Sequence, residues 1–113
     1  MQREDEIRLR HMLDAAREAV ALTANRARKH LDSDRALALA LVKEIEIIGE
    51  AASKVSLGAQ AAIPAIPWAD IVGTRNRLVH AYFDINLDVV WSTATAELPP
   101  LIRELEGLVP EVR

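Results

Sequence analysis

The sequence predicts an all-α protein, an antiparallel four-helix-type bundle with a short extra or kinked C-terminal helix, in a single domain over 1–113. Half of the residues are hydrophobic but only 4% are aromatic, so the core must be aliphatic and rich in alanine. Such residues suit closely packed helices better than sheets. Apolar residues also recur at three- and four-residue spacing, which is the period of an amphipathic helix.

Two long helices are expected in the first half of the chain, over about 4–29 and 34–57. The first carries one apolar stripe without Gly or Pro, made of Leu9, Leu13, Ala16 and Val20. The segment LDSD separates the helices, and Asp32 or Ser33 can cap the second. The second helix is apolar on more than one face, so we expect it at the centre of the bundle. Gly49, Ala51 and Ala52 in this helix would allow another backbone to come close, and simple tight packing is the alternative explanation for these small residues.

Two further helices are expected in the second half of the chain. Gly58 and the prolines of AAIPAIP should end the second helix. A third helix can start at Pro67 and run toward His80, and a fourth follows the connection FDIN from about Leu87. The pair Pro99–Pro100 must kink or restart the fourth helix, because its ring nitrogens donate no hydrogen bonds. An apolar stripe then continues to the end of the chain through Leu101, Leu105 and Leu108.

The charge balance limits the classes of function. A net charge of -3 and a pI near 5.6 argue against a generic nucleic-acid coat protein, but leave room for a local basic patch. The densest basic run is NRARKH, in which Arg26, Arg28 and Lys29 are candidates for contacts with RNA phosphates. The alternative is that this run is the solvated end of a helix.

The composition also indicates the compartment and the cofactors. The absence of cysteine excludes disulfides and thiolate sites. The charged first residues and the lack of a long apolar run indicate a cytoplasmic protein without a membrane partner. A di-metal site of Glu44, Glu46 and Glu50 would need Glu-x-x-His pairs on other helices, and the sequence has none. His11 and His30 show no ligand spacing, so we expect neither metal nor cofactor.

The segment GTRNRLVHAYFD, residues 73–84, gathers the residues with the most chemistry. Metal-free RNA cleavage needs a base for the 2′-OH proton, an acid for the leaving oxygen and a cation near the phosphorane. Imidazole suits both proton transfers near neutral pH, and the planar guanidinium of arginine matches phosphate oxygens. His80 and Arg75 could supply these groups, and Asn76 could orient His80 or hold a phosphate. Alternatively, His80 is a cap or a partly buried core residue, and Arg75 and Arg77 face water.

The spacing within this segment has a geometric consequence. On a regular helix Arg75 and His80 point about 140° apart, so one straight helix cannot aim both at one phosphate. Either the helix breaks near His80, or a second subunit brings its own copies across a two-fold axis.

The same segment resembles a known family. Arg75, His80 and Tyr82 match the R-x4-H-x-Y motif of the HEPN superfamily, and RNRLVHAYFD closely resembles HepT-type toxins of bacterial and archaeal toxin–antitoxin pairs. The likeness extends over nearly the whole chain, through HMLDAAREA, LALALVKEIEIIGEAA, IPWADIVGTRN and ELPPLI.

This resemblance implies a dimeric helical bundle that cleaves RNA without a metal in a composite cleft between subunits. It makes Arg75 and His80 catalytic, with Asn76 and Arg77 in support. The implied partner is a minimal nucleotidyltransferase antitoxin that neutralises the toxin by transferring AMP to Tyr82. Two other functions stay open: a non-catalytic helical dimer that binds a nucleotidyltransferase or a nucleotide, and a subunit of a larger assembly.

Overall fold

The computed structural model describes residues 1–80 and 84–109, apart from the side chains of residues 79 and 80. Its elements are helical throughout these residues: α1 (Arg3–Thr23), α2 (His30–Ser33), α3 (Arg35–Ser53), α4 (Leu57–Ala62), α5 (Trp68–His80), α6 (Leu87–Ser92), the π-helical turn η1 (Thr93–Glu97) and α7 (Leu98–Glu106). The predicted all-α class is confirmed.

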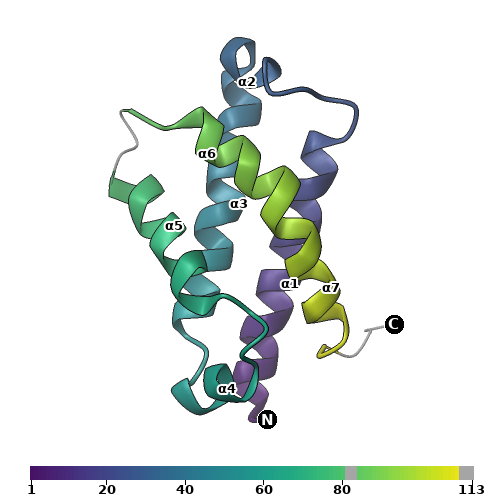
Figure 1. Cartoon of the computed structure of the whole chain (residues 1–113), viewed down its shortest axis with the longest axis vertical. Helices are drawn as coiled ribbons and strands as arrows, with labels where there is room; N and C mark the ends of the chain where they lie inside the picture. Colours follow the sequence, from purple (N-terminus) through teal and green to yellow (C-terminus); the bar gives the residue numbers. More distant parts are fainter. Residues whose placement is uncertain (81–83, 110–113) are drawn as a thin grey trace.

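The central place predicted for the second long helix is also confirmed. α3 lies between α1 and α5 and contacts both, while α6, η1 and α7 run as one rod across α1 and α3 (Figure 1). Successive long helices run in opposite directions (Figure 1). The four rods therefore form an antiparallel bundle in which α3 has neighbours on several sides.

The core follows the apolar stripe predicted for the first helix. Leu9, Leu13 and Ala16 are buried, and Val20 is partly buried against the same cluster. The largest fully buried side chains come from α1, α3, α6, α7 and the connection before α5: Leu9, Met12, Leu13, Leu41, Ile66, Val90 and Leu105. The stripe predicted for the C-terminal segment holds for Leu101 and Leu105 but not for Leu108, which is exposed while Val109 is buried.

The predicted end of the first helix is wrong. α1 ends at Thr23 rather than near residue 29, because Asn25 adopts a left-handed conformation with φ 61°. Asn tolerates this conformation better than most residues and often follows a helix end. The predicted N-cap is wrong as well, since the side chain of Asp34 accepts the Leu37 backbone N–H at 3.0 Å. This bond holds the pKa of Asp34 below its usual value.

The predicted role of Gly58 is also wrong. α3 ends at Ser53, and Gly58 lies inside the short α4, which Ser56 caps by accepting the Ala59 N–H. The buried carboxylate of Asp5 accepts the Ser56 backbone N–H at 2.8 Å and its hydroxyl at 2.7 Å. These two bonds lower the pKa of Asp5 and fix the connection after α3 to the first turn of α1.

The restart expected at the two prolines takes the form of a π-helical turn. In η1 the N–H of Leu98 donates to the carbonyl of Thr93, five residues back. Pro99 and Pro100 then fall in the first turn of α7, where a missing N–H breaks no intrahelical bond. The rod from α6 to α7 continues across the bundle without a loop (Figure 1).

Candidate active site on the α5 face

α5 carries the motif, and its first residue anchors it to the chain before it. Trp68 donates from its indole Nε1 to the carbonyl of Ile63 at 3.0 Å and to that of Gln60 at 3.1 Å. Leu78 is buried further along the helix, and Ile71 packs against the core. α5 is therefore fixed at its start and along one side.

Arg75 packs on α3 at a point where α3 has no side chain. A Cβ on Gly49 would lie 2.6 Å from the Cγ of Arg75 and closer still to its Cβ. Real side chains do not approach this closely, so a larger residue at 49 would push α5 and α3 apart. The close approach predicted at Gly49 is confirmed. It determines how near to α3 the aliphatic part of the Arg75 side chain lies.

Two neighbours hold the guanidinium of Arg75. Its Nη2 donates to the Glu50 carboxylate at 2.8 Å, and its Nη1 donates to Oδ1 of Asn76 at 2.8 Å. The Nε is buried and has no hydrogen-bond partner among the residues that the structure describes. Glu50 also pairs with Lys54 at 3.4 Å. Because the Arg75 side chain stays 30% exposed, its charge is oriented but remains open to an anion.

A polar groove of about 400 Å³ lies beside this guanidinium. Its lining comes from three helices: Arg8 and His11 of α1, Lys43, Glu46, Ile47, Glu50 and Ala51 of α3, and Arg75 of α5. Lys43 and Ile47 are exposed, so the groove follows the side of α3 that faces away from the core. The guanidinium therefore opens onto a surface that could accept an extended, charged molecule.

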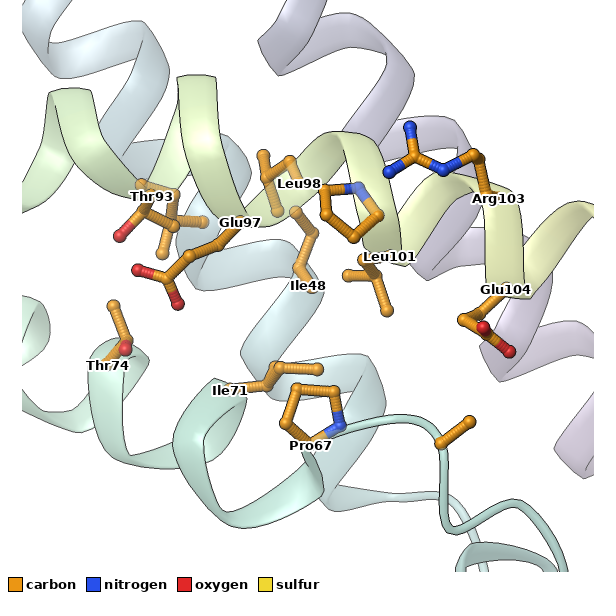
Figure 2. A pocket seen from close by; sticks show the side chains of 13 residues that line it. Ile48, Pro67, Ile71, Thr74, Thr93, Glu97, Leu98, Leu101, Arg103 and Glu104 are labelled. Carbon is orange, nitrogen blue, oxygen red and sulfur yellow. The ribbon is translucent and has the colours of Figure 1, made fainter.

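A second hollow beside α5 is different in character. It is an apolar cavity of about 260 Å³, where Pro67 and Ile71 face Leu98 and Leu101 (Figure 2). The hydroxyl of Thr93, which borders this cavity, is buried and has no partner among the described residues. Neither Arg75 nor Asn76 lines it, so the candidate site is the polar groove.

The predicted site residues do not all meet. Asn76 contacts Arg75, whereas the Arg77 guanidinium donates to the Thr74 hydroxyl at 3.3 Å and lines a separate hollow with Asp70 and Glu97. The backbone of His80 belongs to α5, but its side chain lies outside the described residues. Tyr82 lies outside them entirely.

A comparison with known proteins is decisive for the family. The profile of the HepT-like ribonuclease family matches residues 12–108, which include α3, α5 and the motif. The chain belongs to the HepT-like ribonuclease family. A candidate RNase of Methanocaldococcus jannaschii is 29% identical to it over 89% of this chain and 84% of the relative. A probable ribonuclease HepT of Thermococcus cleftensis is 33% identical over 66% of this chain and 68% of the relative. No solved structure gives a significant match.

In this HepT-like chain the basic run lies on the connection from α1 to α2. Two of its arginines form ion pairs with carboxylates. Arg28 pairs with Asp88 at 2.6 Å and with Asp32 at 3.2 Å, and these bonds raise its pKa. Arg26 lies 3.5 Å from the Asp34 carboxylate. Arg26 and Arg28, two of the three cations predicted to contact RNA, thus link this connection to the N-terminal ends of α3 and α6.

The structure adds residues that the sequence analysis did not assign to the site. The sequence offers Glu50 and His11 only as possible metal ligands, and it predicts no role for Arg8 or Lys43. Their common feature is a place on the outward faces of α1 and α3, a periodicity shared by many solvated residues. Within the described residues no cluster of His, Asp and Glu could hold a metal ion, and no helix is long and apolar enough to cross a membrane.

Proposed function

We propose that this HepT-like ribonuclease is a metal-independent endoribonuclease, the toxin of a toxin–antitoxin pair. Membership of the family gives the activity class, and the observation that carries the rest is the Arg75 guanidinium, held by Glu50 and Asn76 at the edge of an open polar groove. The site acts on RNA in the cytoplasm.

The proposed reaction is an intramolecular attack on the phosphodiester, followed by departure of the 5′-oxygen. A base takes the proton of the 2′-OH, and the 2′-oxygen attacks the adjacent phosphorus. The bond from phosphorus to the 5′-oxygen breaks, and an acid protonates the leaving oxygen, which yields a 2′,3′-cyclic phosphate and a 5′-OH. His80 supplies the proton transfers, each contributing roughly 10²–10⁴ in rate, and Arg75 stabilises the charge on the phosphorane.

The path of α5 supports a homodimer. The helix continues as far as His80, so a break before that residue does not bring it round to Arg75. We propose that a two-fold axis supplies the second set of groups, so that Arg75 and His80 of two copies face one phosphate. Asn76 orients Arg75 in this arrangement, and Arg77 supports the site from the other side of α5.

Regulation is proposed to act through Tyr82, two residues after His80. The partner is a minimal nucleotidyltransferase antitoxin that transfers AMP from ATP to the Tyr82 hydroxyl: the phenol oxygen loses its proton and bonds to the α-phosphorus, and pyrophosphate leaves. The attached adenylate would add negative charge and bulk near the place where an RNA phosphate must enter, and both oppose substrate binding.

The test uses purified protein, single-stranded RNA and EDTA. We expect wild type to cut the RNA and leave 2′,3′-cyclic phosphate ends, and to elute as a dimer at micromolar concentration. His80→Ala should abolish cutting while staying folded and dimeric. If His80→Ala and wild type behave alike in a nuclease-free preparation, the chain is instead a binding module for a nucleotidyltransferase or a nucleotide.

A further inference from the structure

We propose that the polar groove beside Arg75 binds the sugar–phosphate backbone of RNA next to the scissile phosphate, through Arg8 and Lys43 with His11. This inference rests on the proposed function, since it assigns to the same enzyme a binding surface that leads into its active site. It gives a role to three residues that lie outside the motif on α5.

The three helices converge so that these side chains share one groove with the catalytic candidate. Arg8 and His11 are three residues apart on α1, and therefore lie on one side of that helix. Lys43, Ile47 and Glu50 occupy one side of α3 in the same way. All of these residues line the groove that Arg75 closes at its α5 edge. An RNA phosphate at Arg75 would have its neighbouring nucleotide over α3 and α1.

The charges in the groove leave two cations available to a ligand. The structure gives Arg8 and Lys43 no ion pair with any described residue, whereas Glu50 already pairs with both Arg75 and Lys54. Arg8, Lys43 and Arg75 face only two carboxylates in the lining, those of Glu46 and Glu50. The groove is thus locally positive on a chain whose net charge is -3. Such a site attracts phosphates by releasing their counterions.

The other lining residues suit a nucleotide better than a small inorganic anion. Ile47 is 36% exposed and forms an apolar part of the lining between the charges. His11 is exposed and offers a ring on which an unpaired base can stack. Contacts to phosphates position the chain without reading its sequence, so we expect this groove to add affinity with little preference for particular bases.

Binding to a 2′-O-methyl RNA oligonucleotide, which lacks the attacking hydroxyl, tests the inference by fluorescence anisotropy at several salt concentrations. Arg8→Ala and Lys43→Ala should each weaken binding about 3- to 10-fold near 0.1 M salt and lower the salt slope by roughly 0.7 per lost phosphate contact. His11→Ala should weaken binding without changing the slope. With cleavable RNA, the Arg8 and Lys43 variants should raise KM and leave kcat nearly unchanged.

Arg35→Ala is the matched control, since Arg35 is an exposed cation of α3 outside the groove. It should leave affinity and salt slope at the wild-type values. If wild type binds and cleaves RNA but the Arg8 and Lys43 variants match Arg35→Ala, the groove inference is overturned and the proposed function stands. If those variants instead weaken dimer formation or nucleotidyltransferase binding and keep RNA affinity, the groove is a protein interface. A wild type that neither binds nor cuts RNA overturns both proposals.

Discussion

The basic run on the α1–α2 connection and the groove beside Arg75 both gather positive charge, but the fold treats them in opposite ways. In the run, Arg26 and Arg28 bind carboxylates of Asp34, Asp32 and Asp88, which lie close by or across the bundle. In the groove, the structure gives Arg8 and Lys43 no carboxylate partner within the described residues. Two arginines of the run are thus paired with carboxylates, whereas Arg8 and Lys43, brought together from two helices, are available to a ligand.

This difference shows why a count of cations in a sequence is a weak guide to RNA binding. Asp32 and Asp34 stand within a few residues of the run, and Asp88 reaches it from the start of α6. An ion pair of this kind at the surface adds little to the stability of the fold, because solvent screens it. It still lowers the positive potential that a phosphate would encounter. Whether a cation is available to RNA therefore depends on which acidic side chains the fold brings near it.

Removing one arginine from each cluster separates their roles most strongly. Arg75→Ala should lower the rate of RNA cleavage by about 10²–10³, as expected for the loss of a group that stabilises transition-state charge. Arg28→Ala should change the rate by less than about two-fold, because Arg28 lies outside the groove that Arg75 lines and pairs with Asp88 and Asp32. The cleavage rates are measured under single-turnover conditions, with the same RNA for both variants. An equal loss of cleavage rate in both variants would mean that the basic run also contributes to the active site.

The packing of Arg75 can be disturbed without touching its charge. Gly49→Ala puts a methyl group against the arginine stem, where neither partner can move away freely, and should lower the free energy of unfolding by about 1–3 kcal/mol. Cleavage should fall as well, because α5 must shift to relieve the contact. Thermal unfolding and a cleavage assay measure the two effects.

Gly73→Ala is the matched substitution on α5 itself. A Cβ at this position meets nothing within 4 Å. Alanine favours a helix over glycine by about 1 kcal/mol, so this variant should be as stable as wild type or more so. If both glycine variants unfold alike, the close approach of α3 and α5 at Gly49 does not hold in solution.

A smaller effect is expected where two carboxyl groups, those of Glu44 and Glu18, lie close together. Partial burial, together with a hydrogen bond and repulsion from Glu18, raises the pKa of Glu44 from 4.5 to about 7. The folded protein therefore holds more protons than the unfolded chain between these values, and its stability should fall as the pH rises through that window. Glu44→Gln should remove this fall, so its Tm advantage over wild type should grow from pH 5 to pH 8. A difference that does not change with pH would contradict the raised pKa.

The helical class, the central α3 and the close approach at Gly49 follow from apolar spacing and residue size, and all three could be predicted. The end of α1 and the cap of α3 could not, because no glycine or proline marks them. Asn25 ends α1 through a left-handed backbone conformation, and Asp34 rather than Asp32 reaches the free N–H groups. Several residues of this segment could end α1 or cap α3, and small differences in local geometry select among them.

For the site, the motif marked Arg75 because its chemistry lies within a short stretch of chain. Local periodicity shows which side of a helix is buried, since burial of apolar surface is the dominant force and repeats with each turn. It does not show which outward sides come to face each other. The gathering of Arg8, Lys43 and Glu50 around Arg75 depends on how closely and at what rotation α1, α3 and α5 pack, and that depends on contacts between residues far apart in the chain.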